Sequence, residues 1–304
     1  MKSGDQNWKT GLVLLTVYVV WGTTHFATLV AVQSIPPMFM TGVRFTVAGA
    51  VMLAIAGLAS LRNLTPQLFL NCAAAGILMS FASMTLAGVA IASGVSSGLM
   101  ACIVATMPFW LTLLAHLGGE QVSTRSWIGV GLGVTGAFLL LFDGNLGSTP
   151  LGTLFAFLSA FAWALGSYWV RRAALPTSLL SPALQWLTGG IVGLLASLMF
   201  EVDYVSATLA GLQTSSILAW CYLLVFGTLI TYTAYLWLVR NVSAPLAGSC
   251  AFVNPVIAVS IGAAFAGERL DSESFWAVAL ILLALLLLIY RPKASSPVAQ
   301  PVKT

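Results

Sequence analysis

The sequence predicts an all-α integral membrane protein with ten transmembrane helices, arranged as two inverted five-helix repeats around a central cavity. Three observations predict this fold. The chain of 304 residues is 59% hydrophobic and only 7% charged, whereas a soluble domain carries about a quarter charged residues. Its apolar residues form runs that are long enough to cross a bilayer, and one long segment of the chain occurs twice.

The apolar runs set the number of helices. A transmembrane helix needs roughly 20 mostly apolar residues, and charged residues, glycines and prolines divide the chain into about ten such stretches. Because the runs are long and lack strand-like alternation, they favour helices over a barrel. The predicted helices lie at 11–33, 38–61, 68–92, 95–117, 126–142, 150–170, 179–200, 214–239, 243–266 and 273–290.

The basic residues indicate the orientation. With the amino terminus in the cytoplasm, ten of the twelve basic residues fall on the cytoplasmic side, and only Arg269 falls outside. This bias follows the positive-inside rule. We therefore expect both termini in the cytoplasm. The net charge of +4 then reflects topology, and it does not indicate nucleic-acid binding.

The duplicated segment indicates how the two halves are related. Residues 94–120 and 241–268 both have Val-Ser near the start, a proline in the middle and Gly-Glu at the end. Pro108 and Pro255 are 147 residues apart (255 − 108). Five predicted crossings separate the copies, so they run in opposite directions, as in alternating-access transporters.

The repeat predicts the organisation of the chain. We expect the first five-helix repeat at 1–143 and the second, inverted repeat at 150–291. Residues 292–304 are rich in proline and serine, which predicts a disordered cytoplasmic tail.

Short motifs carry a family resemblance. They are Trp-Gly-Thr-Thr in the first predicted helix, PPMFMTGVRF at the second, and RNVSAPLAGSCAFVNPV and GERL in the second half. In order and spacing they resemble the EamA type of the drug/metabolite transporter superfamily, from residue 11 to about 290. The resemblance implies a basket-like fold with a central cavity, a bacterial inner-membrane location, and export of amino acids or other small metabolites.

Polar and aromatic residues at mid-span are the candidates for a substrate cavity, because inverted-repeat carriers bind near the bilayer midplane. Trp21, Thr24 and His25 share one helix face by their spacing. For each candidate, packing or an interhelical hydrogen bond is the alternative role. The predicted cavity residues are Trp21, Thr24, His25, Ser80, Trp163, Ser167, Trp186, Tyr232, Tyr235 and Asn254.

Two prolines and one arginine interrupt the apolar runs. Pro108 and Pro255 predict kinks, which act either as hinges for gating or in packing alone. Arg44 is the only permanent charge within a predicted span. Its side chain either extends to the outer interface or contacts an anionic group such as a substrate carboxylate.

The expected function follows from these residues and from the resemblance. A neutral, aromatic and hydroxyl-rich cavity suits small amphiphiles such as aromatic or other apolar amino acids. No carboxylate lies mid-span and no Walker A motif is present, so we expect facilitated or weakly coupled alternating access. The alternative is a proton-coupled exporter of toxic amphiphilic compounds, with His25 as the proton carrier.

Other classes of protein fit the sequence less well. An intramembrane enzyme or a channel would need catalytic pairs or selectivity elements that the sequence does not show. The four cysteines lie at no metal-ligand spacing, so we expect no metal and no cofactor. The expected partners are a small-molecule substrate and the lipid bilayer, with the chain as a monomer or a weak homodimer.

Overall fold

The computed structural model describes residues 2–95, 100, 103–141, 149–176, 179–201, 211–253, 256–257 and 272–289. In this part of the chain all regular structure is helical. Six helices are long and apolar enough to cross a membrane, and three shorter apolar helices accompany them. This confirms the prediction of an all-helical membrane protein. The number of ten crossings and the inversion of the halves stay predictions, and the predicted tail lies outside the described residues.

Most of the described helices lie close to the predicted ranges, but α1 begins at Lys2, before the predicted start at residue 11, and the predicted helices at 95–117 and 243–266 are described only in part. Those of the first half are α1 (Lys2–Ala31), α2 (Pro37–Ala56), η1 (Leu58–Asn63), α3 (Pro66–Ala75), η2 (Gly76–Ser83), α4 (Met84–Ala92), α6 (Met107–Leu117) and α7 (Thr124–Leu141). Those of the second half are α8 (Pro150–Arg172), α9 (Leu180–Phe200), α11 (Thr214–Tyr222), η3 (Leu223–Tyr232), α12 (Thr233–Asn241), α13 (Ala244–Gly248) and α15 (Ser272–Ile289).

Two long helices contain a π-helical segment in the middle. One runs from Pro66 to Ala92 through η2, and the other runs from Thr214 to Asn241 through η3. π-helical turns are rare and are found mostly at functional sites. Each segment buries one face in the protein and exposes the other: Ser80 and Tyr232 are buried, whereas Ile77 and Phe226 are 40% and 46% exposed.

Local chemistry fixes where the helices begin. Proline occupies the first turn of α2, α3, α6 and α8, where its absent N–H is no loss. Thr65 and Thr149 are N-caps, and their hydroxyls accept hydrogen bonds from the N–H groups of Leu68 (3.3 Å) and Gly152 (3.1 Å).

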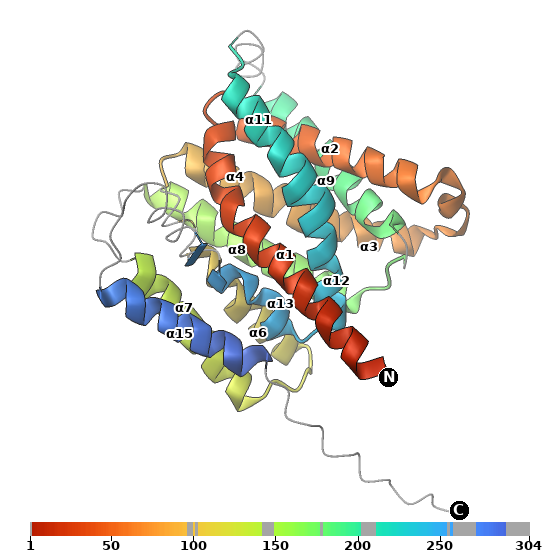
Figure 1. The fold of residues 1–304 in the computed structure, drawn as a ribbon. Helices are drawn as coiled ribbons and strands as arrows, with labels where there is room; N and C mark the ends of the chain where they lie inside the picture. The colour runs from red at the N-terminus through yellow and green to blue at the C-terminus, as the bar shows by residue number, and fades with distance from the viewer. Residues whose placement is uncertain are drawn as a thin grey trace, which may run out of the picture.

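Two pairs of helices pack side by side along their length (Figure 1). α2 lies along α9, and α7 lies along α15. The first pair approaches closely because of glycines: a Cβ atom at Gly190 would lie 2.3 Å from the backbone N of Thr46. Small residues allow such backbone contacts between membrane helices. A Cβ atom at Gly129 would lie 3.0 Å from Leu288, so this glycine packs within the chain.

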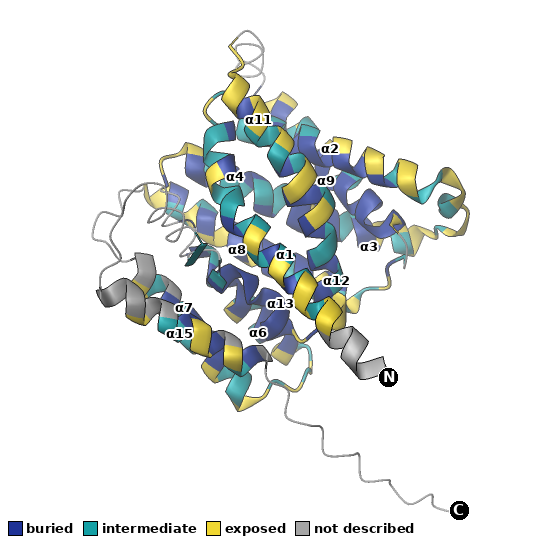
Figure 2. Cartoon of the chain, in the orientation of Figure 1, coloured by how far each residue is buried: buried dark blue, intermediate teal, exposed yellow. Residues whose placement is uncertain are grey.

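The distribution of buried and exposed residues suits a protein in lipid (Figure 2). Large apolar side chains cover the outside, and Met199 and Phe26, for example, are 75% and 69% exposed. The interior contains aromatic residues with polar atoms, and Trp186 and Tyr235 are completely buried. An apolar exterior around a partly polar interior is the arrangement expected where the surrounding solvent is hydrocarbon.

Candidate functional site

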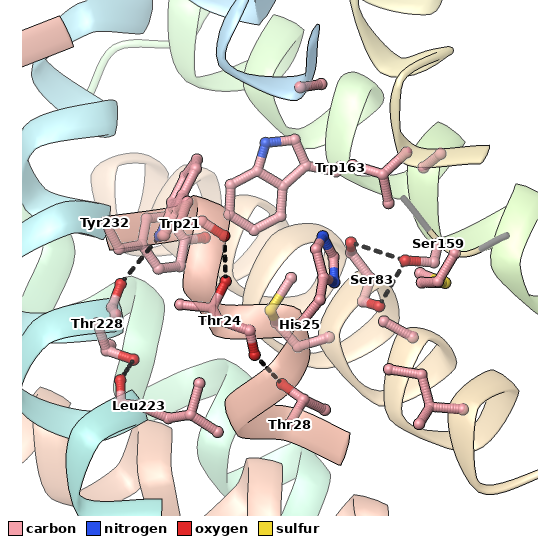
Figure 3. A pocket seen from close by; sticks show the side chains of 18 of the residues that line it. Trp21, Thr24, His25, Thr28, Ser83, Ser159, Trp163, Leu223, Thr228 and Tyr232 are labelled. Atoms are coloured by element: carbon pink, nitrogen blue, oxygen red, sulfur yellow. Dashed lines mark hydrogen bonds between the residues drawn. The ribbon is translucent and has the colours of Figure 1, made fainter. Parts of the chain in front are cut away.

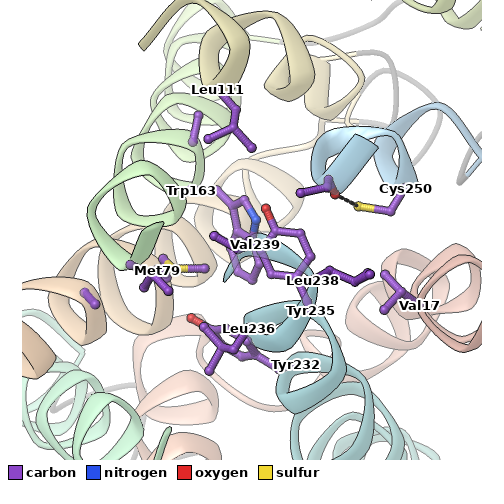
Figure 4. Close-up of a cluster of buried hydrophobic side chains, with 14 of the residues drawn as sticks. Val17, Met79, Leu111, Trp163, Tyr232, Tyr235, Leu236, Leu238, Val239 and Cys250 are labelled. Atoms are coloured by element: carbon purple, nitrogen blue, oxygen red, sulfur yellow. Dashed lines mark hydrogen bonds between the residues drawn. The ribbon is translucent and has the colours of Figure 1, made fainter. Parts of the chain in front are cut away.

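Four aromatic side chains meet at the centre of the bundle. Trp21 of α1, Trp163 of α8, Tyr232 of η3 and Tyr235 of α12 form what we call the aromatic cluster. The Trp21 ring centroid lies 5.2 Å from that of Trp163 and 4.9 Å from that of Tyr235. Trp163 lies 5.1 Å from Tyr232. Figure 4 shows Trp163, Tyr232 and Tyr235 in the hydrophobic core. Helices from both halves of the chain therefore meet through these rings.

Hydrogen bonds fix the polar edges of the cluster. The Tyr235 hydroxyl is 2.9 Å from Ser167 Oγ, and the Tyr232 hydroxyl is 3.3 Å from Ser80 Oγ. Trp21 Nε1 donates to the carbonyl oxygen of Gly227 at 3.2 Å. Ser80 belongs to η2 and Gly227 to η3. Each π-helical segment therefore supplies one partner to the aromatic cluster.

A cavity of about 110 Å³ lies beside the aromatic cluster. Five predicted residues line it, namely Trp21, Thr24, His25, Trp163 and Tyr232, and Arg44 lines it as well. In Figure 3 His25, Trp163 and the hydroxyl-bearing side chains converge from different helices. The structure thus brings together residues that are far apart in the sequence.

The hydroxyl groups of the cavity are largely bonded to the protein. Ser159 Oγ donates to the carbonyl oxygen of Ser83 at 2.9 Å. Thr24 and Thr28 donate to carbonyl oxygens of their own helix at 2.8 and 2.9 Å. The imidazole of His25 has no hydrogen-bond partner among the described residues. It is therefore a polar group of the wall that is free to bind a ligand.

Several predicted residues support the cavity without lining it. Ser80, Ser167 and Tyr235 hold the aromatic cluster through the hydrogen bonds given above. Trp186 packs on Tyr232, with ring centroids 5.6 Å apart. The hydroxyls of Ser80, Ser167 and Tyr235 are thus bonded within the protein, whereas the buried Nε1 of Trp186 has no hydrogen-bond partner among the described residues.

The interrupting residues have different places in the structure. Pro108 lies in the first turn of α6, after a turn at 105–106, so the predicted kink is a break between two helical segments. Asn254 and Pro255 lie outside the described residues. Arg44 is only 5% exposed, so its side chain does not extend to the interface. It lines the cavity instead, and its predicted contact with an anionic group stays a prediction.

Four methionines of the cavity wall were not among the predicted residues. They are Met40, Met84, Met100 and Met107. A search for polar, aromatic and helix-breaking residues passes over methionine, because an apolar run in a membrane protein looks the same whether it faces lipid or a cavity. Their thioethers are flexible and polarisable, and they fill irregular spaces.

The two ends of the bundle carry different polar contacts. At the end where α1 leads into α2, the Glu201 carboxylate accepts hydrogen bonds from the N–H groups of Met38 (3.0 Å) and Phe39 (2.9 Å). We call this the Glu201 end. The N-terminus of α11 lies there too, since Ser216 Oγ donates to the carbonyl of Val30 at 2.8 Å. Glu201 thus satisfies backbone donors at the start of α2.

The opposite end, which we call the Arg171 end, is closed by an ion pair. Arg171 Nε lies 2.7 Å from a carboxylate oxygen of Glu120. Its guanidinium also donates to the carbonyl oxygens of Val239 (2.8 Å) and Val242 (2.5 Å), where α12 finishes. One side chain therefore ties together α8, α12 and the segment after α6.

The cavity lies on the Glu201 side of the aromatic cluster. Its lining residues on α1 extend from Trp21 only toward Thr28, and those of the Thr214–Asn241 helix lie between Leu223 and Tyr232. Tyr235, on the far side, does not line it. The aromatic cluster therefore separates the cavity from the Arg171 end.

An all-helical membrane bundle with a central aromatic cavity is typical of small-molecule carriers. The sequence profile of the EamA-like transporter family matches residues 8–142 and again residues 150–290. The chain therefore belongs to the EamA-like transporter family, within the drug/metabolite transporter superfamily. It is a membrane transporter, as predicted from the sequence.

Individual relatives agree with this membership. The inner membrane transporter YedA of Escherichia coli (strain K12) is 34% identical over 274 residues, covering 90% of this chain and 88% of the relative. A protein of the same strain named as a probable amino-acid metabolite efflux pump is 24% identical and covers 93% and 95%. A solved crystal structure has the same fold, with a TM-score of 0.73, 22% identity, and coverage of 91% of this chain and 95% of that chain.

Proposed function

We propose that this protein exports amino acids with aromatic or other apolar side chains, and related small metabolites, by alternating access across a bacterial inner membrane. One observation carries the proposal. The cavity occupies one side of the aromatic cluster, at which both halves of the chain meet, and the other side is tied by Arg171. A carrier held open to one face has this arrangement. The name of the efflux-pump relative supports the direction and the substrate class.

The proposal includes ten crossings in two inverted repeats, with both termini in the cytoplasm. Two regularities support it. The π-helical segments begin at Gly76 and Leu223, which are 147 residues apart (223 − 76), the same offset as between Pro108 and Pro255. Packing recurs as well: α4 contacts α8, and the corresponding helices α12 and α1 also contact each other.

The proposed orientation determines which side of the membrane the cavity faces. With the amino terminus of α1 in the cytoplasm, the Glu201 end faces outward and the Arg171 end faces the cytoplasm. On this orientation we infer an outward-facing state, from which substrate leaves. The inward-facing state requires the contacts of Arg171 to break and the aromatic cluster to separate.

Transport without a coupled ion is the first candidate, because no described carboxylate lines the cavity. A proton-coupled exporter of toxic amphiphilic compounds is the second. It is favoured by His25, which lines the cavity without a hydrogen-bond partner among the described residues. Histidine is the side chain that commonly exchanges protons near neutral pH.

Reconstituted flux tests the function. Purified protein in proteoliposomes is loaded with unlabelled phenylalanine, and uptake of labelled phenylalanine is followed with and without a pH gradient. Saturable uptake with counterflow is expected, because a carrier exchanges substrate through one site. The His25→Ala variant should retain this exchange, and an uncoupler should not abolish net efflux. Loss of efflux on uncoupling would instead favour the proton-coupled candidate, and linear, non-saturating flux would favour a channel.

A further inference from the structure

Arg44 is a buried cation without a counterion in the described part of the chain. It belongs to α2, one of the membrane-length helices, and it is 5% exposed. The ion pair seen in the described part of the chain joins Arg171 to Glu120 and does not involve Arg44. The Nε atom of Arg44 is buried and has no hydrogen-bond partner there. A charge placed this way inside a membrane is costly, and in membrane proteins such residues are commonly functional.

None of the described side chains around Arg44 neutralises its charge. Its guanidinium carbon lies 4.7 Å from the ring centroid of Phe45, which contributes a weak attraction and no counter-charge. The nearby carboxylate at the same end of the bundle, Glu201, already accepts bonds from Met38, Phe39 and Ser197. The positive charge of Arg44 is therefore directed at the cavity that this residue lines.

Because the described remainder of the cavity wall carries no opposite charge, Arg44 determines which charged groups the cavity attracts. The described lining residues include no aspartate or glutamate. A wall of aromatic rings and thioethers has a low dielectric, which strengthens the field of the Arg44 charge. An organic cation entering this space would meet repulsion, whereas an anionic group would be attracted. A guanidinium binds a carboxylate with two parallel hydrogen bonds, which makes that anion its preferred partner.

We propose that Arg44 binds the carboxylate of the transported molecule. The cavity then takes small carboxylates with an apolar side chain, zwitterionic amino acids among them, and excludes organic cations. The apolar part of the ligand contacts the methionine side of the wall. This inference rests on the proposed function in taking this cavity as the substrate site, and it goes further in making the carboxylate, and not the amino group, the feature that is recognised.

Binding tests the inference without flux. Purified protein in detergent is unfolded thermally in the presence of phenylacetate, phenylacetamide or phenethylamine, which share the aromatic part and differ in charge. Phenylacetate should raise the unfolding temperature of the wild type, and the amide and the amine should not. In Arg44→Gln the affinity for phenylacetate should fall about tenfold or more, because a charge-assisted bond is lost. Arg44→Lys should keep part of the response.

Two controls distinguish a binding role from a structural one. Arg62→Gln removes an exposed basic residue of η1 that does not line the cavity, so it should bind phenylacetate as the wild type does. Without ligand, Arg44→Gln should unfold at the same or a higher temperature than the wild type, because an uncompensated buried charge is gone. A charge held by a partner within the protein would give the opposite shift.

The outcomes separate this inference from the proposed function. Equal stabilisation of the wild type by acid and amide would overturn the inference, and this comparison needs no variant. Equal transport of phenylalanine by wild type and Arg44→Gln would also overturn it while leaving the exporter standing. Binding of phenylacetate through Arg44 without any flux in proteoliposomes would instead overturn the exporter and leave the carboxylate site standing.

Discussion

Single side chains at the centre of this protein are held by a small number of directed bonds. Tyr235 is completely buried, and its hydroxyl meets Ser167 Oγ at 2.9 Å. Ser167 in turn donates to the carbonyl oxygen of Trp163 at 2.8 Å. These bonds orient two rings of the aromatic cluster. The residues that support the cavity therefore determine its shape, as do the residues that line it.

Removing the Tyr235 hydroxyl tests this support. Tyr235→Phe should lower the free energy of unfolding by about 1 kcal/mol, because Ser167 loses a hydrogen-bond partner in a buried site. Thermal unfolding in detergent measures the change. Ser167→Ala should cost a similar amount, and the double variant should cost less than the two single changes together. Strict additivity would contradict a direct interaction between the two hydroxyls.

At the scale of the element, contact between helices depends on glycine where backbones meet. A Cβ atom at Gly190 of α9 would lie 2.3 Å from the backbone N of Thr46 on α2. Gly131 of α7 has nothing within 4 Å of the same position. These two glycines therefore offer a matched comparison between close packing and open space.

The comparison predicts that alanine at these two positions changes the stability of the protein in opposite directions. Gly190→Ala should destabilise the protein by about 2 kcal/mol or more, since α2 and α9 must move apart. Gly131→Ala should be neutral or stabilise the protein by up to about 1 kcal/mol, because alanine is the better helix former. Unfolding temperatures of the two variants decide the matter, and a destabilised Gly131→Ala would argue against the open space around α7.

The contacts between helices at the Arg171 end depend on a single side chain. Arg171→Gln leaves the Glu120 carboxylate without its partner and the carbonyls of Val239 and Val242 without their donor. We expect a loss of about 2 kcal/mol in stability. Arg172→Gln is the control, because this exposed neighbour donates to the Gly118 carbonyl and lies over the Tyr168 ring, and neither contact involves Glu120 or α12. Similar losses in both variants would show that Arg171 has no special role.

For the whole molecule, the orientation in the membrane is the property to test. Alkaline phosphatase fused after Ser34, between α1 and α2, should be active because this turn is predicted to lie outside. The same enzyme fused after Leu64, between η1 and α3, should be inactive. A fluorescent protein at the carboxyl terminus should fluoresce in the cytoplasm. Activity at Leu64 would reverse the proposed direction of the cavity.

Much of the fold and part of the cavity could be predicted from the sequence. The features that could not be predicted share a physical reason. Membrane helices are predicted from the length and hydrophobicity of their sequences, and the prolines of α2, α3 and α8 indicate where these helices begin. The sequence predicts Trp21 and Trp163 as cavity residues because large rings with a polar edge are unusual at mid-span, and both line the cavity. The π-helical segments and the lining methionines carry no such mark, because their places depend on packing between helices far apart in the chain.

The four methionines of the cavity wall have a consequence for the breadth of recognition. An unbranched thioether has three rotatable bonds, and it changes rotamer at small cost. A wall of Met40, Met84, Met100 and Met107 can therefore reshape itself around guests of different outline. Promiscuous binding proteins use methionine-rich surfaces in this way. Selectivity among side chains should be loose here, and replacing these methionines with leucine should narrow the range of accepted molecules.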